Sequence, residues 1–122
     1  MIVRHRDDLA GTPGELLGER DAHWRYLHEA DGLGFSLVEG QLEAGREAVL
    51  RYPDHGEANL ILEGEAEVTN LDTGETHRLR PGSLYAVDGQ RHRFRCLTDI
   101  RLVSVFRPAL RPGEKPNRPD GG

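Results

Sequence analysis

The sequence predicts an all-β fold, either a sandwich or a small barrel of antiparallel strands. The chain has 122 residues, which allows one compact domain and leaves no room for a second. From Gly34 onward, β-forming runs separated by turn residues recur roughly every ten positions, a spacing typical of antiparallel sheets. The turn at 72–74, Asp-Thr-Gly, indicates a hairpin. The expected strands are residues 34–39, 47–52, 57–63, 65–71, 75–80, 83–88, 92–97 and 101–107.

Two segments flank the strand-rich region, which spans residues 33–107. Residues 1–32 are predicted to form a short N-terminal arm that packs on the barrel, with a Gly-Thr-Pro-Gly turn at 11–14 and one brief helix at 15–20. Residues 108–122 contain four of the seven prolines and three glycines, so we expect a tail or a lid there and no strand.

Composition limits the possible partners. The 21 acidic and 16 basic residues give a net charge of -5, which argues against nucleic acid as a partner. Nothing approaches the ~18 consecutive apolar residues of a membrane span, and the first 20 residues lack the apolar stretch of a signal peptide. The single cysteine, Cys96, excludes an internal disulfide and a Cys-x2-Cys zinc site. We therefore expect a cytoplasmic protein that acts on a small molecule, away from membranes.

The alternation of side chains along the strands predicts which residues face the interior. In 91–95 three arginines share one face, so His92 and Phe94 must share the other. By the same rule Glu57 faces the interior if Asn59 does. An interior carboxylate needs a partner, because an unpaired buried charge costs several kcal/mol. Two further sets each share one face of their strand: Ser83, Tyr85 and Val87, and Leu102, Ser104 and Phe106.

Two partial motifs resemble those of the cupins, a family of small jelly-roll barrels also described as double-stranded β-helices. Gly45, Glu57 and Gly64 stand at the spacing of the first motif, whose two histidine positions here hold Arg51 and Pro53. The chain thus resembles a cupin with two metal ligands missing from this motif.

The second cupin motif is also incomplete. Gly89 and His92 stand at its spacing, with Val87 in place of its proline and Cys96 in place of its asparagine. Together the two motifs keep one carboxylate and one imidazole of the usual cupin metal site. An ion pair between Glu57 and Arg51 is the alternative to a metal.

Longer stretches carry a more specific resemblance, to the ectoine synthase family, over most of residues 1–110. The similar stretches, in chain order, read MIVRHRDDLAGT, DGLGFS, HGEANLILEGEAEV, RPGSLYAVD and VFRPAL. The resemblance implies a metal held by Glu57, Tyr85 and His92, with Fe(II) expected and zinc or manganese as other candidates. Two hard oxygen donors and one nitrogen suit such a divalent ion.

The same resemblance implies a reaction. Ectoine synthases are cyclising hydro-lyases that close N4-acetyl-L-2,4-diaminobutyrate into the cyclic amidine ectoine, with loss of water. The resemblance implies that His55 and Glu114 are catalytic proton carriers. The implied substrate-binding residues are Trp24, Tyr52, Ser104 and Phe106, of which Trp24 and Phe106 would form an apolar wall.

Several positions depart from the family pattern. Val38 and Gly40 replace a polar residue and a threonine, Ser104 replaces a cysteine, and Pro116 replaces a histidine. The family's arginine near its tryptophan has only Arg25 as a match. A metal-dependent cupin that acts on a different small amino acid derivative is therefore one alternative.

A second alternative is a non-catalytic cupin module that binds a small molecule. Arg51 and Pro53, at the two histidine positions of the first motif, favour it. In each case we expect a homodimer, because cupins commonly pair through edge strands and so protect unpaired backbone groups.

Overall fold

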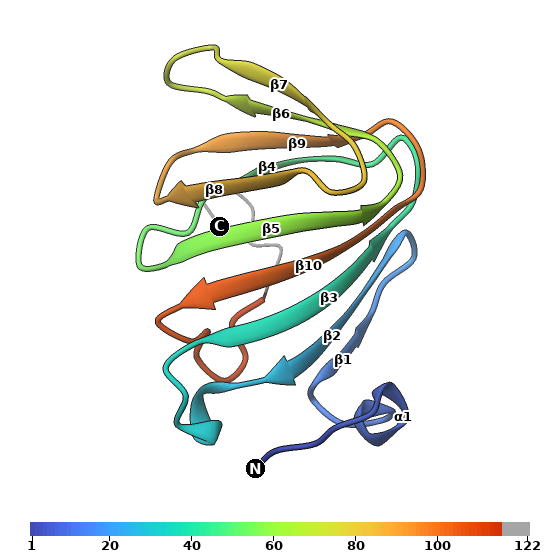
Figure 1. The fold of residues 1–122 in the computed structure, drawn as a ribbon, viewed down its shortest axis with the longest axis vertical. Helices are drawn as coiled ribbons and strands as arrows, with labels where there is room; N and C mark the ends of the chain where they lie inside the picture. The colour runs from blue at the N-terminus through green and yellow to red at the C-terminus, as the bar shows by residue number, and fades with distance from the viewer. Residues whose placement is uncertain (116–122) are drawn as a thin grey trace.

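The computed structural model describes residues 1–115 of the chain as a fold made almost entirely of antiparallel strands (Figure 1). Apart from the strands, it contains a one-turn helix α1 (Arg6–Leu9) and a short 3-10 turn η1 (Glu29–Asp31). The strands are β1 (Glu15–Leu17), β2 (Asp21–Leu27), β3 (Ser36–Leu42), β4 (Glu47–Leu50), β5 (Gly56–Glu63), β6 (Ala66–Asn70), β7 (Thr76–Leu79), β8 (Leu84–Asp88), β9 (His92–Cys96) and β10 (Ile100–Arg107).

The strands form two sheets. One has six strands in the order β1-β2-β3-β10-β5-β8, and the other has four in the order β4-β9-β6-β7. Neighbouring strands pair antiparallel throughout, and the chain crosses between the sheets as in a jelly roll (Figure 1). The predicted all-β antiparallel fold is confirmed, and the eight expected strands coincide with β3 to β10 to within a few residues.

The helix expected at residues 15–20 is wrong. Residues 15–17 instead form β1, which pairs with β2, and the turn between them closes where the Gly18 amide donates to the Asp21 carbonyl at 2.8 Å. The segment 1–32 is thus more than an arm, because β1 and β2 extend the six-stranded sheet. Pairing with a neighbouring strand outweighs the local helical preference of such a short run.

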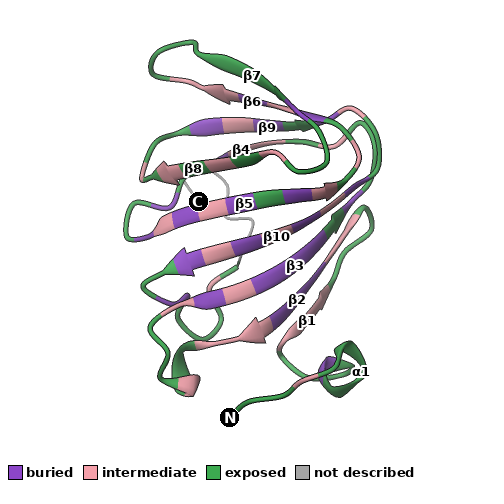
Figure 2. Cartoon of the chain, in the orientation of Figure 1, coloured by how far each residue is buried: buried purple, intermediate pink, exposed green. Residues whose placement is uncertain are grey.

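The core lies between the two sheets, and burial alternates along the strands (Figure 2). His92, Phe94 and Cys96 are buried while Arg95 is exposed, as the three arginines on the other face predict. The largest fully buried side chains are those of Tyr52, Phe106, Ile61, Leu110, His92, Val38 and Ser36. The burial of a tyrosine, a histidine and a serine among these apolar side chains indicates a functional site in the interior.

Gly64 shows why a first-motif glycine is needed at the turn between β5 and β6. Its φ of +89° lies in the left-handed region, and a Cβ built there would stand 2.0 Å from the Asp99 carbonyl oxygen. Any other residue would push the two segments apart.

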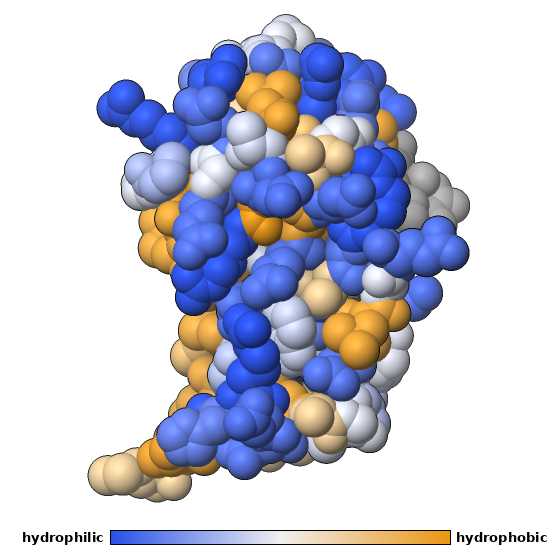
Figure 3. Space-filling model, turned by 90° about the vertical axis from the view of Figure 1, so that its right-hand side faces the viewer, coloured by the Kyte–Doolittle hydropathy of each residue, from blue (hydrophilic) through white to orange (hydrophobic). Residues whose placement is uncertain are grey.

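The surface seen in Figure 3 is mostly hydrophilic, with hydrophobic patches broken up by charged side chains. Among the larger apolar side chains, Leu17, Leu33, Leu60 and Leu84 are exposed. Within residues 1–115, no helix has the length and hydrophobicity needed to cross a bilayer.

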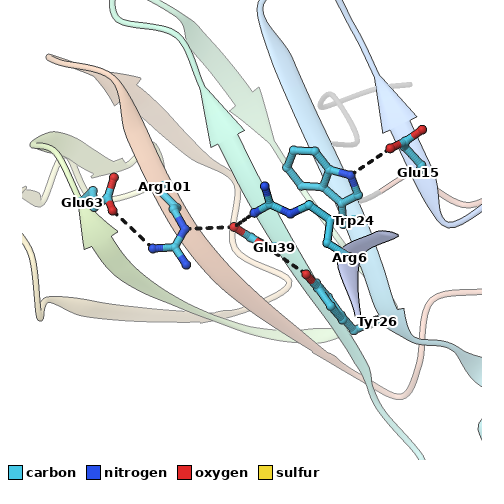
Figure 4. A network of polar contacts seen from close by, with 7 residues as sticks. All are labelled: Arg6, Glu15, Trp24, Tyr26, Glu39, Glu63 and Arg101. Carbon is cyan, nitrogen blue, oxygen red and sulfur yellow. Dashed lines mark hydrogen bonds and ion pairs between the residues drawn. The ribbon is translucent and has the colours of Figure 1, made fainter. Parts of the chain in front are cut away.

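A buried carboxylate on the outer face of the six-stranded sheet fastens the N-terminal segment. Glu39 is only 6% exposed and accepts hydrogen bonds from Arg101 Nε at 2.9 Å, from the Tyr26 hydroxyl at 3.3 Å and from the Arg6 guanidinium (Figure 4). The Arg6 guanidinium also lies over the Trp24 ring, 4.2 Å from its centre. Helix α1 is therefore attached to the sheet by one shared carboxylate.

We expect Glu39→Ala to lower the free energy of unfolding by about 2 kcal/mol, because it leaves two arginines without their buried partner. Hydrogen exchange of the amides of residues 4–9 should also become faster. The control is Glu63→Ala, which removes a carboxylate that is 69% exposed and should change stability by less than about 0.5 kcal/mol. Equal effects of the two substitutions in urea unfolding would contradict this role of Glu39.

Candidate metal centre and its surroundings

The three residues expected to bind a metal lie near one another inside the fold. Glu57 on β5 is 5% exposed and His92 on β9 is 1% exposed. Glu57 Oε1 and His92 Nε2 lie 3.6 Å apart, and neither has a hydrogen-bond partner among residues 1–115. The ring of Tyr85, on β8, packs edge-on against the His92 ring with centres 5.7 Å apart. Three separate strands thus bring a carboxylate, an imidazole and a phenol together.

The hydrogen bonding of His92 decides which of its nitrogens is available. Its Nδ1 lies 3.0 Å from the Gln90 carbonyl, which can only accept, so Nδ1 carries the proton. Burial lowers the pKa of His92, which keeps the ring neutral and leaves a lone pair on Nε2. This lone pair faces the Glu57 carboxylate, so a cation fits between the two atoms.

Burial also controls the two oxygen donors. It raises the pKa of Glu57 to about 7, against the opposing effect of the neighbouring Asn59 amide. For the half-buried Tyr85, burial and the negative charge of Glu57 both raise the pKa of the phenol. Both oxygens would bind a cation in their deprotonated forms, and a cation would in turn favour those forms.

Arg51 does not neutralise Glu57. Its side chain is exposed, and its Nε donates to the Gly89 carbonyl at 3.3 Å. Residues 1–115 contain no cluster of three His, Cys, Asp or Glu side chains that could hold a metal, so a third protein ligand has to be of another type. Tyr85, whose ring packs against the His92 ring, is the candidate for it. The donor set therefore fits a divalent ion better than the alternative ion pair does.

A second cluster adjoins the metal donors. Phe106 on β10 stands opposite Glu57 in the strand register, and Tyr52 packs edge-on against it with ring centres 5.0 Å apart. The His55 ring lies 6.3 Å from the Phe106 ring, and its Nε2 is 3.0 Å from both carboxylate oxygens of Glu114. The structure thus brings together four of the six residues expected to bind substrate or carry protons.

His55 and Glu114 are arranged to hold a proton. The Pro108 carbonyl, 2.7 Å from His55 Nδ1, can only accept, so Nδ1 donates to it. The Nε2 atom lies 3.0 Å from the Glu114 carboxylate, within reach for a proton to pass between the two groups. The ring is therefore fixed in orientation at one nitrogen and available for proton transfer at the other.

The segment that carries Glu114 covers the interior. The Leu110 amide donates to Ser36 Oγ at 2.9 Å, and the Arg25 guanidinium donates to the carbonyls of Arg111 and Glu114. Leu110 is fully buried. Residues 108–115 are thus a docked cover, whereas Pro116 and the rest of the expected tail or lid lie outside the described residues.

Trp24 does not belong to the cluster, and its assignment to an apolar wall with Phe106 is wrong. It lies on the outer face of β2, where its Nε1 donates to Glu15 at 3.2 Å and its ring contacts Arg6 (Figure 4). Its neighbours His23 and Arg25 face inward, and strand alternation then turns Trp24 outward. A match by residue type alone missed this alternation.

The departures at Gly40 and Ser104 have local explanations. A Cβ built on Gly40 would lie 3.3 Å from both His23 Cδ2 and Leu102 Cδ1, so the His23 ring occupies the space beside this position. Ser104 faces the interior, but its hydroxyl donates to Asn59 Oδ1 at 2.5 Å and is not free for another acceptor. Val38 is fully buried in the core.

Two interior residues, Arg25 and Asn59, were not assigned a role from the sequence. Arg25 is 8% exposed, and its Nε has no hydrogen-bond partner among residues 1–115. The same is true of Asn59 Nδ2, in a side chain that is 3% exposed. The face that Asn59 shares with Glu57 was the available signal for it.

A pocket of about 660 Å³ borders this region. Its walls come from the N-terminal segment, from η1 and from residues 110–115, and they include Arg25 and Glu114. The pocket is lined largely by apolar groups such as Leu9 and Leu110. It offers room for a small molecule beside Arg25 and Glu114, whereas Glu57, Tyr85 and His92 do not line it.

Comparison with known proteins gives consistent matches. The family model described as ectoine synthase matches residues 1–121. The chain is 45% identical over 111 residues to the L-ectoine synthase of Thermobifida fusca, covering 90% of this chain and 83% of that one. It is 44% identical over 114 residues to the L-ectoine synthase of Streptomyces anulatus, covering 90% and 86%.

Comparison with solved structures gives a match to an ectoine synthase and further matches to the fold. The crystal structure of ectoine synthase from P. lautus matches with a TM-score of 0.83 and 36% identity, over 90% of this chain and 80% of that one. KdgF from Halomonas sp. matches with a TM-score of 0.68 at 18% identity, which supports the fold alone. A cupin from Shewanella frigidimarina, described as RmlC-like, matches similarly with a TM-score of 0.65 at 22% identity.

The buried carboxylate of Glu57 should make the stability of the metal-free protein depend on pH. The pKa of Glu57 is about 7 in the fold against 4.5 in the unfolded chain, so the unfolded chain binds fewer protons between these values. The free energy of unfolding therefore falls as pH rises from 4.5 to 7, by on the order of 3 kcal/mol in total. We expect metal-free Glu57→Gln to gain stability relative to the wild type as pH rises from 5 to 8.

Urea unfolding at both pH values measures this gain. Glu63→Gln, on the same strand but exposed, is the control and should show no such trend. A Glu57→Gln difference of the same size at pH 5 and pH 8 would contradict the raised pKa.

Proposed function

The chain belongs to the ectoine synthase family, and we propose that it is a cyclising hydro-lyase that converts N4-acetyl-L-2,4-diaminobutyrate to ectoine and water. The matches extend along nearly the whole chain and most of each relative. They do not favour the two alternatives, a cupin with a different substrate and a non-catalytic binding module.

The observation that best supports a catalytic site is the pair of buried lone pairs on Glu57 Oε1 and His92 Nε2, 3.6 Å apart beside Tyr85. We propose that these three residues hold a divalent metal, with Fe(II) favoured and zinc or manganese as alternatives. When bound, such an ion would polarise the acetamide carbonyl of the substrate. The hard oxygen donors and the neutral imidazole suit these ions.

The residues around the proposed metal would assist ring closure by proton transfer and by excluding water. The 2-amino nitrogen of the substrate attacks the acetamide carbon, two protons leave the nitrogens, and the oxygen departs as water. We assign His55 and Glu114, whose Nε2 and carboxylate lie 3.0 Å apart, to deliver a proton to the departing oxygen. Tyr52 and Phe106 exclude water around the reacting atoms, because both are almost completely buried.

Arg25 is our candidate for the substrate carboxylate. Its Nε is a buried donor without a partner in residues 1–115, and its side chain borders the pocket beside Glu114. An arginine in this position can pair with a carboxylate through two parallel hydrogen bonds. Binding the carboxylate here would orient the amino group for attack.

We propose that the protein works in the cytoplasm. Cys96 is buried and unpaired, as expected for a protein of the reducing cytoplasm. The product of the proposed reaction, a small neutral solute, fits a role in protection against osmotic stress.

We further propose a homodimer formed through the β8 end of the six-stranded sheet. Within residues 1–115, β8 is the last strand of that sheet, so its outer backbone groups are open to pairing. Leu84 on β8 and its register partner Leu60 on β5 are 61% and 38% exposed on the outer face. A second copy would cover both the edge and these side chains.

Incubation with N4-acetyl-L-2,4-diaminobutyrate tests the proposed reaction directly. The wild type reconstituted with Fe(II) should form ectoine, as followed by chromatography. Glu57→Ala and His92→Ala should each lower the bound metal at least ~10-fold, because each removes a ligand. Glu114→Gln should keep the metal but lower kcat by about a hundredfold through loss of proton transfer.

Three outcomes would contradict this proposal. Full metal occupancy without ectoine would show that the substrate is wrong. Unchanged metal content in His92→Ala would exclude it as a ligand, and unchanged kcat in Glu114→Gln would exclude proton transfer through that residue.

Sedimentation velocity tests the dimer. The wild type should sediment at twice its 13.6 kDa monomer mass, and Leu84→Glu should shift it to the monomer because it places a charge in the interface. Leu17→Glu is the matched control, on the exposed β1 end of the same sheet. A monomeric wild type, or dissociation by Leu17→Glu instead of Leu84→Glu, would contradict the β8 interface.

A further inference from the structure

Asn59 lies in the middle of β5, on the interior face of the six-stranded sheet and next to its edge strand β8. In the strand register it stands between Ser104 on β10 and Tyr85 on β8, and it lies two residues from Glu57 along β5. These four side chains form a continuous polar patch on a face that is otherwise lined by Val38, Ile61, Leu102 and Phe106. An amide in such a place needs partners for both of its ends, because a buried unpaired polar group costs about 1–3 kcal/mol.

Only one end of the amide has such a partner. The Ser104 hydroxyl donates to Asn59 Oδ1 at 2.5 Å, and this distance suits an O–H···O bond, so the oxygen faces Ser104. The amide nitrogen is therefore directed away from Ser104. It has no hydrogen-bond partner in residues 1–115, although it interacts with the Glu57 carboxylate.

We propose that Asn59 is a positioning residue for the metal centre. The Ser104 hydroxyl anchors its side-chain oxygen, so that Nδ2, which has no partner in residues 1–115, is held where it can donate to Glu57 and orient that carboxylate when a metal binds. This inference rests on the metal site of the proposed function. It assigns Ser104 a structural role behind Asn59 in place of the substrate contact expected from the sequence. A hydrogen-bonded partner of this kind restricts the rotation of a ligand and so strengthens metal binding.

The arrangement predicts an order of effects. Asn59→Leu keeps the approximate shape of the side chain and removes both polar ends, so Glu57 loses its donor. Ser104→Ala removes only the anchor, so Asn59 remains but can rotate. If Ser104 acts through Asn59, its removal matters only when Asn59 is present.

The test measures the affinity of the metal-free full-length protein for Co(II), whose visible absorption reports binding without any turnover. We expect Asn59→Leu to raise the Kd for Co(II) ten- to a hundredfold, and Ser104→Ala to raise it less, by roughly three- to tenfold. The double variant should bind no more weakly than Asn59→Leu alone. Circular dichroism of each metal-free variant confirms that it is folded.

Ser36→Ala is the matched control, because Ser36 is a fully buried serine on the same sheet face whose hydroxyl accepts from the Leu110 amide. It should lower thermal stability and leave the Kd for Co(II) within about twofold of the wild type. Unchanged affinity in Asn59→Leu, or independent and additive effects of Asn59→Leu and Ser104→Ala, would overturn the positioning role while the metal site stands. A wild type that does not bind Co(II) would instead overturn the metal site itself.

Discussion

The structure depends on the close approach of two buried lone pairs, on Glu57 Oε1 and His92 Nε2. Neither atom has a hydrogen-bond partner in the described chain, and the hydrogen bond from His92 Nδ1 to the Gln90 carbonyl keeps the lone pair on Nε2. Like-polarity groups this close are unfavourable unless a positive charge lies between them. The two atoms are nevertheless held close, because β5 and β9 belong to different sheets that are fixed against each other by a packed core.

The surroundings of this pair determine the chemistry. Phe106, opposite Glu57 in the register, contacts the Tyr52 and His55 rings, so the proposed metal activation and proton transfer would take place side by side in the interior. Low polarity around the charges strengthens each of these interactions. Asn59 and Ser104, two register positions from Glu57 and Phe106, are hydrogen-bonded to each other and would support the carboxylate.

Much of the fold followed from short-range patterns, and much of the site did not. Alternation placed His92 and Phe94 inside correctly, because a side chain in a strand has only two faces to choose from. It put Glu57 on the same face as Asn59, and the structure shows that this face is the interior one. The same rule applied to β2 would have turned Trp24 outward, but the sequence signalled no strand there, and the run at 15–20 looked helical. The pairing of β1 with β2 is a tertiary effect that local preference does not record. The hydrogen bond between Ser104 and Asn59 depends on the register of β5 and β10, which the sequence does not determine.

The cover formed by residues 108–115 has a consequence for turnover. Glu114 belongs to the cover itself, and the same segment supplies the Pro108 carbonyl that orients His55. Undocking it to exchange substrate and product would therefore dismantle the acid-base pair in the same motion. The acid-base pair would therefore be absent whenever the site is open to water. A reaction intermediate that escaped at that moment would meet no proton donor that could promote its hydrolysis.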